Sequence, residues 1–312
     1  MAFRTMIPHS RPHLAAAHSV TAHVFTASNC CTKSSPLPIR LVQINSIKAR
    51  RYLGLQTNTE KERIRSLRTT SPSSSSLAAA SVQENLPPSL EATSEPPPLF
   101  DGTTRLYIAY VCPFAQRAWI TRNYKGLQDS INLVAIKLQS RPAWYKEKVY
   151  AANTVPSLEH NGKIIGESLD VIKYLDSNFE GPPLSSNDPA KKEFAEELIA
   201  YTDTFTKTIF SSFKGDPIKE SGPVFDHIEE TLHKFDDGPF FLGQFSLVDI
   251  AYITFFERFQ IFFSEVWKHD ITAGRPKLAK WIEEVNKIDA YKQTKIDPNE
   301  HLETFKARFL AK

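Results

Sequence analysis

Apolar and β-branched residues gather in short runs between residues 101 and 181, and longer stretches with helical spacing separate these runs. The runs at 106–109 and 131–136 have the length and composition of buried strands. Two more runs flank Asn161-Gly162, a dipeptide that is typical of a two-residue hairpin turn. The pattern therefore predicts two strands joined through a helix and followed by a hairpin.

Helices are expected between and after these strands. The first begins at Pro113, because proline suits the first position of a helix, and Gly126 suits its end. A proline near the start of 141–146 predicts another helix, and 167–179 carries apolar residues at helical spacing. The predicted order is β-α-β-α-β-β-α over residues 101–181, which is the order that a thioredoxin-like domain requires.

After Gly181 and two prolines the chain shows only helical patterns, which predicts an all-α domain over residues 185–312. A long helix should begin at Asp188-Pro189 and end by 214–215, and a second should run from about Pro223 to Asp236. We expect three further helix starts, at Ser246–Asp249, Arg275-Pro276 and Asp297-Pro298.

The helix after Ser246 is apolar on almost every side, so we expect it at the buried centre of its domain. Its phenylalanines could form a wall for a flat co-substrate, but core packing is the favoured interpretation. These residues are Phe255, Phe256, Phe259, Phe262 and Phe263.

The N-terminal residues differ in composition from the rest. Residues 1–59 contain seven Lys or Arg and no Asp or Glu, with many Ser, Thr and Ala. This composition is typical of an organelle transit peptide, and the compact apolar core of a secretory signal is not present. We therefore expect a transit peptide and disordered segment at 1–80, a Pro/Ser-rich linker at 81–100, and the first ordered domain from about residue 100. The alternative is a basic tail that is never cleaved.

The basic character of the whole chain comes from this N-terminal segment. The chain has 38 Lys and Arg and 35 Asp and Glu, a net charge of +3. Without the seven basic residues of 1–59, 31 basic and 35 acidic residues remain, a net charge of −4. Binding of nucleic acid is therefore not expected. The sequence has no apolar run of the length, about 18 residues, that predicts a membrane span.

Three cysteines occur in the 312 residues, and Cys30 and Cys31 lie in the N-terminal segment. Adjacent cysteines without other metal ligands do not match zinc spacing, so no metal site is expected. Cys112 alone remains in the predicted domains, which excludes a disulfide framework and agrees with a reducing compartment.

Cys112 stands where the first predicted strand stops and the helix at Pro113 begins, so we expect it to be the N-cap residue. A thiolate there accepts hydrogen bonds from free N–H groups and lies at the positive end of the helix dipole, which predicts a lowered pKa. The alternative is a small buried side chain without chemistry. Ala115 occupies the position of the second cysteine of a Cys-x-x-Cys motif, so a mixed disulfide on Cys112 needs an external thiol, for which glutathione is the obvious candidate.

Two more positions fit a site around this thiol. Pro156 lies within a strand pattern, and a cis peptide at Val155-Pro156 would turn the Val155 backbone toward a bound peptide. Glu167-Ser168 opens a helix, where free N–H groups and the Ser168 hydroxyl can hold a carboxylate. The alternative for this pair is ordinary helix capping.

These residues together resemble the cysteine-containing branch of the glutathione transferase superfamily. Four strings are similar to the plant lambda class in particular: YVCPFAQRAWITRN, HNGKIIGESLDVIKYLDSNF, FDDGPFFLG and SLVDIAYITFFERFQ. The resemblance covers residues 103–310 and implies an α/β thioredoxin-like N-terminal domain joined to an all-α C-terminal domain. With the serine run at 73–76, it favours the chloroplast stroma over the mitochondrion as the destination of the transit peptide.

The resemblance also implies the residues of the site, with Cys112 as the catalytic nucleophile, glutathione as co-substrate and no metal. Arg141 falls where omega-class relatives carry a basic residue that contacts glutathione. Thr154 departs from the lysine that is common in the lambda class, which puts a charge contact from this position in doubt. The expected glutathione-binding residues are Pro113, Phe114, Arg141, Val155, Pro156, Glu167 and Ser168.

The expected activity is that of a glutathione-dependent thiol transferase, which removes glutathione from small molecules such as flavonoid-like conjugates. It rests on Cys112, because conjugating transferases place Ser or Tyr there to stabilise the thiolate of glutathione, whereas a cysteine forms a disulfide with it. Dehydroascorbate reduction is a second enzymatic hypothesis. A third is a non-catalytic carrier of heterocyclic or flavonoid-like ligands. The resembling class is typically monomeric, and no membrane is an expected partner.

Overall fold

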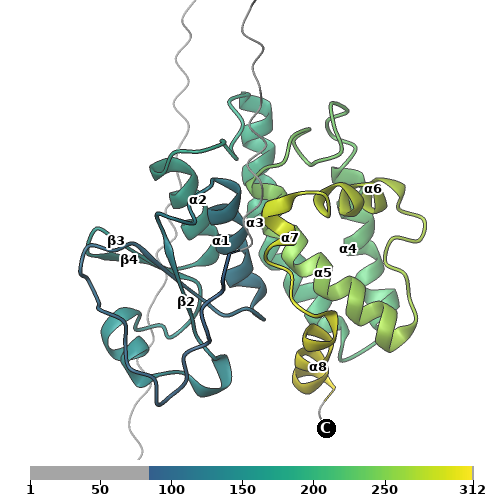
Figure 1. Ribbon diagram of the computed structural model, residues 1–312. Coiled ribbons are helices and arrows are strands. Elements are labelled where there is room, and N and C mark those ends of the chain that lie inside the picture. The colour runs from purple at the N-terminus through teal and green to yellow at the C-terminus, as the bar shows by residue number, and fades with distance from the viewer. Residues whose placement is uncertain (1–83, 311–312) are drawn as a thin grey trace, which may run out of the picture. The chain divides into compact units, whose positions relative to one another are not determined.

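Four short strands form one mixed sheet in this computed structural model, which describes residues 84–310 (Figure 1). The transit peptide expected at 1–80, with Cys30 and Cys31, lies outside the described residues. The strands are β1 (Arg105–Ile108), β2 (Asn132–Ala135), β3 (Ser157–His160) and β4 (Lys163–Ile165), in the order β2-β1-β3-β4. β1 is parallel to β2 and antiparallel to β3, and β3 and β4 form the expected hairpin. Asn161 and Gly162 both have positive φ, as its turn requires.

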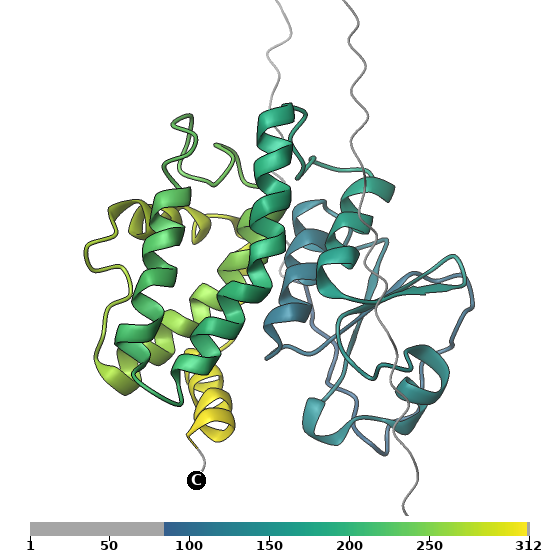
Figure 2. The same ribbon diagram turned by 180° about the vertical axis from the view of Figure 1, so that it is seen from behind.

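Two helices complete the sheet domain, α1 (Pro113–Tyr124) and α2 (Ser168–Asn178), and they pack against each other (Figures 1 and 2). Between β2 and β3 the structure has a 3₁₀ turn, Leu138–Ser140, and a π-helical turn, Tyr145–Val149, where an α-helix was expected. Tyr145 is fully buried and accepts the N–H of Tyr150, which closes the wide turn. The expected α/β thioredoxin-like architecture is confirmed.

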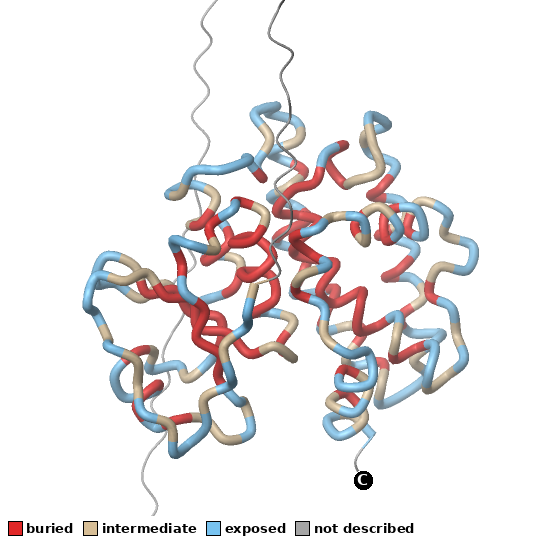
Figure 3. Tube along the Cα trace, viewed as in Figure 1, coloured by how far each residue is buried: buried red, intermediate tan, exposed pale blue. Residues whose placement is uncertain are grey.

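From Pro189 onward the elements of the described chain are all helices, which confirms the expected all-α domain. The helices are α3 (Pro189–Ser212), α4 (Pro217–Thr231), α5 (Leu247–Trp267), α6 (Pro276–Val285), α7 (Asp289–Lys292) and α8 (Pro298–Phe309). Figure 3 shows that α5 is buried along most of its length, as its apolar sequence predicts. Its five phenylalanines are each at most 1% exposed, so their assignment to the core is confirmed. Within residues 84–310, no helix combines the length and the apolar character that a membrane span needs.

The helix expected from Pro223 begins earlier, so this prediction was wrong. α4 starts at Pro217, after Asp216, whose side chain accepts the N–H of Lys219 at 3.1 Å. Pro223 lies inside the helix. The Asp-Pro pair at 216–217 has the same cap chemistry as the pair at 188–189, where the Asp188 side chain accepts two backbone N–H groups. The cap residue therefore determines where this helix starts, and the internal proline is tolerated.

Residues 84–100 bond to the sheet domain, so the prediction that 81–100 is only a linker before the first ordered domain was wrong for this part. We call residues 84–100 the strap. Leu90 forms a parallel bridge with Ile136 at the end of edge strand β2. The Tyr110 hydroxyl donates to Pro87 O at 2.5 Å, and the Trp144 indole donates to Ser94 O at 2.8 Å. Backbone bonding to an edge strand stabilises a segment whose composition alone suggests disorder.

Glu84 fixes the start of the strap. Both of its carboxylate oxygens accept from the Arg122 guanidinium, at 2.7 and 2.8 Å, and Arg122 is 1% exposed. We expect Glu84→Gln to lower the free energy of unfolding by about 2 kcal/mol, because the buried cation loses its bidentate counter-ion and water replaces it only in part. Urea unfolding measures this change.

Glu91→Gln is the matched control. Glu91 pairs with Lys137 at 2.7 Å, but both side chains are about half exposed, so the change should stay below about 0.5 kcal/mol. Equal effects of the two substitutions would contradict the anchoring role of Glu84.

Candidate active site

Cys112 lies between the end of β1 and Pro113, the first residue of α1, and is the N-cap residue as expected. It is a free thiol and is 9% exposed. Its Sγ donates a long hydrogen bond to Val155 O, at 3.8 Å, and does not cap the helix with its side chain. The end of β1 therefore places the Cys112 thiol between the N-terminus of α1 and Val155, which lies just before β3.

The thiol pKa differs from the prediction. Burial raises the pKa of Cys112, and this effect outweighs the N–H groups of Ala115 and Phe114 and the nearby Arg258 and Arg117, all of which lower it. The prediction of a lowered pKa was therefore wrong for the chain alone. On burial the thiolate loses more hydration free energy than it gains from the dipole of one helix.

The Val155-Pro156 peptide is cis, as predicted. Both residues are buried. The Tyr145 hydroxyl donates to Thr154 O at 2.7 Å and bonds the Ser157 hydroxyl at 2.9 Å, so it holds the chain on both sides of this peptide. Sequence reasoning missed Tyr145, whose role depends on the π-helical turn.

A cavity of about 570 Å³ adjoins the N-terminus of α2 and brings together three predicted residues, Phe114, Glu167 and Ser168. Ser168 is buried, whereas Glu167 and Phe114 are exposed. Phe114 packs edge-on against Phe255 of α5, with ring centroids 5.1 Å apart. The cavity is thus lined by the Phe114 ring and by the first residues of α2, whose N–H groups have no partner within the helix.

Arg117 also lines this cavity, and sequence reasoning missed it. It is 2% exposed, and it donates to Ser168 Oγ at 3.0 Å and twice to Ala251 O, at 2.7 and 3.0 Å. Burial lowers its pKa to about 10, so it stays protonated at neutral pH. Within residues 84–310 it forms no salt bridge, and its guanidinium lies over the rings of Phe114 and Phe255. Four carboxylates also line the cavity, those of Glu167, Asp170, Glu196 and Asp203. No pattern in the sequence distinguishes Arg117 from the other basic residues of this segment.

Backbone geometry sets the direction of Glu167. Its φ is +59°, in the left-handed region, and its carboxylate lies 3.5 Å from the Tyr150 hydroxyl. Gly166 precedes it, and a Cβ there would come within 2.0 Å of the same hydroxyl. Only glycine therefore allows Tyr150 to approach the start of α2.

Arg141 follows the 3₁₀ turn and is half-buried. Its Nε is buried without a hydrogen-bond partner. Among the described residues no hydrogen bond or ion pair joins it to Cys112, Glu167 or Ser168. Arg141 therefore offers an unpaired cationic donor, but the structure does not bring it into contact with the other predicted residues.

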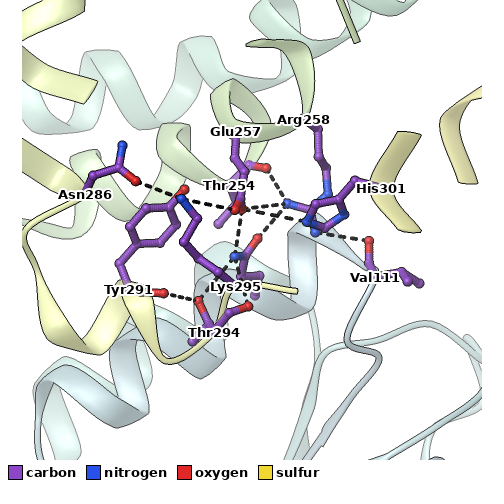
Figure 4. A network of polar contacts seen from close by, with 10 residues as sticks. Val111, Thr254, Glu257, Arg258, Asn286, Tyr291, Thr294, Lys295 and His301 are labelled. Atoms are coloured by element: carbon purple, nitrogen blue, oxygen red, sulfur yellow. Dashed lines mark hydrogen bonds and ion pairs between the residues drawn. The ribbon is translucent and has the colours of Figure 1, made fainter. Parts of the chain in front are cut away.

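A buried polar network joins the two domains next to Val111, the residue before Cys112 (Figure 4). Gln116 of α1 donates to Glu257 at 3.0 Å and to the Thr294 hydroxyl at 3.2 Å. Arg258 donates to Gln116 Oε1 at 2.6 Å and to Val111 O at 3.1 Å. The residue before the nucleophile is thus tied to α5.

His301 of α8 borders this network. It is 2% exposed, its Nε2 has no hydrogen-bond partner, and Nε2 lies 3.9 Å from a Glu257 oxygen. Burial, with Arg258 and Lys295 nearby, lowers its pKa to about 3. The ordinary pKa of about 6.5 applies to the unfolded chain, which therefore takes up a proton first as the pH falls.

We therefore expect stability to be lost as the pH falls below about 6.5. Between pH 7.5 and 5.0 this residue should account for at most about 2 kcal/mol of the loss, and His301→Gln should remove that part. Urea unfolding at both pH values measures it. His233, which is exposed, serves as the control, and an unchanged pH dependence in His301→Gln would contradict the expectation.

Comparisons with known proteins agree with this architecture. Residues 106–183 match the family "Glutathione S-transferase, N-terminal domain", and residues 222–284 match "Glutathione S-transferase, C-terminal domain". The solved tau-class glutathione S-transferase of mango, Mangifera indica, is 27% identical with a TM-score of 0.58, over 67% of this chain and 99% of that one. The chain therefore belongs to the glutathione S-transferase family.

Two relatives from one plant show which class of glutathione S-transferase the chain belongs to. Glutathione S-transferase L3 of Arabidopsis thaliana is 67% identical over 227 residues, which are 73% of this chain and 97% of the relative. Glutathione S-transferase L2, chloroplastic, of the same plant is 57% identical over 232 residues, 74% of this chain and 80% of the relative. The protein is a glutathione transferase of the plant lambda class, an enzyme of a family that uses glutathione as co-substrate.

Proposed function

We propose that this enzyme is a glutathione-dependent thiol transferase that removes glutathione from glutathionylated small molecules. The observation that carries the proposal is the free thiol of Cys112, which lies between the N-terminus of α1 and Val155 O. Cys112 is the single cysteine within residues 84–310, so a disulfide formed on it has no resolving thiol there.

The residues around Cys112 fit glutathione as co-substrate. The N–H groups at the start of α2, the Ser168 hydroxyl and the unpaired charge of Arg117 can hold one carboxylate. The unpartnered Nε of Arg141 supports this residue as the donor to the second carboxylate. The backbone of Val155 can bond the peptide, and Pro113, Phe114, Pro156 and Glu167 shape the surroundings. Glutathione would supply the second thiol of the reaction.

The atoms balance without any other reactant. The Cys112 thiolate attacks the glutathionyl sulfur, the bond from that sulfur to the small molecule breaks, and the small molecule leaves with the electron pair and takes up a proton. A glutathione thiolate then attacks the disulfide on Cys112, forms oxidised glutathione and releases the Cys112 thiolate. The small molecule is reduced, and two glutathione sulfurs are oxidised to a disulfide.

The test uses the full chain with reduced glutathione and two substrates, a glutathionylated small thiol and a flavonoid-like thioether conjugate. We expect formation of oxidised glutathione and of the free small molecule in equal amounts. With an aryl halide electrophile we expect little or no conjugate. Rapid conjugation without release from either glutathionylated substrate would overturn the proposal.

A ligand carrier is the second candidate, and the exposed Phe114 beside Phe255 favours it as an aromatic contact. A carrier should bind a flavonoid-like ligand equally well with and without Cys112, and should release no oxidised glutathione. Dehydroascorbate reduction is the remaining alternative. It would appear as oxidised glutathione that forms with dehydroascorbate but with neither glutathionylated substrate.

We also propose that the protein enters the plastid. The acidic-poor residues 1–59 support this proposal, as does the relative named chloroplastic. Import of the full chain into isolated chloroplasts should shorten it at a site before Glu84, because the strap belongs to the folded domain. Retention at full length outside the organelle would contradict the proposal.

A further inference from the structure

Arg258 is a fully buried cation of α5 that reaches the loop of the nucleophile. Its side chain is 0% exposed. Nη2 donates to Val111 O at 3.1 Å, and Nη1 donates to Gln116 Oε1 and to Thr254 O, both at 2.6 Å. Val111 immediately precedes Cys112 and Gln116 follows it by four residues, so the guanidinium bonds the chain on both sides of Cys112. Figure 4 shows Arg258 beside Val111.

The positive charge of Arg258 is only partly compensated by the groups around it. Its three hydrogen-bond acceptors are neutral oxygens. The carboxylate of Glu257 lies 3.6 Å away, and it also accepts from Gln116. The Nε of Arg258 is buried without a partner. Burial of a cation with an orphaned donor is costly, so stability alone does not explain this residue.

We propose that Arg258 is a positioning residue for Cys112, which holds the turn before α1 and favours the thiolate over the thiol through its charge. This inference rests on the proposed thiol transferase chemistry, in which the thiolate is the attacking group. It gives the helical domain a part in the reaction, because Arg258 acts from α5 on a nucleophile of the sheet domain.

Charged and titratable groups face Cys112 from several elements. Arg117 and the first N–H groups of α1 favour the thiolate, as Arg258 does. Tyr145 of the π-helical turn is neutral at pH 7, because burial raises its pKa. Burial disfavours the anionic form of Cys112, and the positive charges of Arg258 and Arg117 oppose this effect by stabilising the thiolate.

A second set of groups surrounds Arg258 itself. Glu257 reduces the effect of its charge, and Lys295 lies 3.9 Å from Glu257. Burial keeps His301 neutral and raises the pKa of Tyr291. The Arg258–Glu257 ion pair therefore lies beside two groups, His301 and Tyr291, that burial disfavours in their charged forms.

The test is the pH dependence of Cys112 alkylation by iodoacetamide in the full chain, followed on the Cys112 peptide by mass spectrometry. Arg258→Gln should slow alkylation at pH 7 about tenfold and move the midpoint of the profile up by about one pH unit. Arg258→Lys keeps the charge and should stay within about threefold of the wild type.

Glu257→Gln gives a test in the opposite direction. Without the carboxylate the charge of Arg258 is less compensated, so alkylation at pH 7 should become faster, and the midpoint should move down. Because exposure of the buried thiol would also speed alkylation, the near-ultraviolet circular dichroism and the urea midpoint of this variant must match those of the wild type. This variant also keeps the proposal falsifiable if Arg258→Gln fails to fold, which circular dichroism reports.

Arg275→Gln is the matched control. Arg275 bonds Asp226 of α4 and contacts no residue of the Cys112 turn, so its alkylation profile should equal that of the wild type. Unchanged profiles in folded Arg258→Gln and Glu257→Gln would overturn the inference. If the profiles move as expected but no oxidised glutathione forms from glutathionylated substrates, the positioning role stands and the proposed function fails.

Discussion

Cys112→Ser is expected to reduce the release of oxidised glutathione from glutathionylated substrates by at least about a thousandfold, as removal of a nucleophile does in other enzymes. The serine hydroxyl is far less acidic than a thiol and cannot form a disulfide with glutathione. The substitution removes one sulfur atom from a buried site and leaves the polar groups at the start of α2 unchanged. The measurement is the steady-state rate with the glutathionylated small thiol.

Binding of glutathione is the control for this variant. The groups proposed to hold the carboxylates, Arg117, Arg141 and Ser168, remain, so the dissociation constant from calorimetry should change by less than about tenfold. A loss of rate with retained binding assigns the effect to the chemical step. Full reductase activity in Cys112→Ser would show that another group attacks the conjugate.

Asp249→Asn should produce the largest loss of stability. Asp249 is fully buried and its carboxylate accepts four hydrogen bonds, from the N–H and hydroxyl of Ser246, the N–H of Phe241 and the indole of Trp281. Burial raises its pKa to about 6, so it is a carboxylate at pH 7.5. The amide nitrogen of asparagine would replace one acceptor oxygen and face donors. We expect a loss of about 3 kcal/mol at pH 7.5, measured by urea unfolding.

The same substitution at Asp188 is the matched control. Asp188 caps α3 at an exposed position, where its side chain accepts the N–H groups of Ala190 and Lys191. Asparagine caps a helix about as well as aspartate, so Asp188→Asn should change stability by less than about 0.5 kcal/mol. A similar loss in both variants would contradict the interpretation that buried acceptors, rather than helix capping alone, make Asp249 important.

Elements with local signals were predictable from the sequence. Cys112-Pro113 indicated a strand that stops and a helix that starts, and the Asn161-Gly162 turn indicated the hairpin. Asp188-Pro189 located the start of α3. These signals depend on residues that are adjacent in the sequence, so they can be recognised without knowledge of the fold. Asp216-Pro217 carries the same signal and gives the start of α4 correctly, whereas Pro223 lies inside the helix.

The strap was not predictable because its stabilisation is long-range. Five of its 17 residues are proline, and a high proline content is usual in disordered segments. The bonds that order it reach residues far along the chain, such as Arg122 and Trp144. Composition indicates how much apolar surface a segment can bury by itself. It does not show which hydrogen bonds the edge of a neighbouring strand can make with that segment.

The surroundings of Cys112 show the same limit. The sequence predicts the start of α1, and this position in turn predicts a lowered pKa for the Cys112 thiol. The burial that raises the pKa comes from the folded chain. Arg258 lies 146 positions after Cys112, and only the packing of α5 against α1 brings it to the same turn. A helix N-terminus is a local feature, so the sequence predicts that Glu167 and Ser168 lie at one, whereas the position of Arg117 beside the same cavity depends on the fold.

The most direct test of the monothiol chemistry is the intact mass of the full chain after exposure to oxidised glutathione. Cys30→Ser and Cys31→Ser are introduced first, so that Cys112 is the single thiol. We predict one glutathionyl adduct, which reduced glutathione removes and which is absent when Cys112→Ser is added. No adduct on the chain that keeps Cys112 would contradict the account, since the buried thiol would then be unreactive toward glutathione.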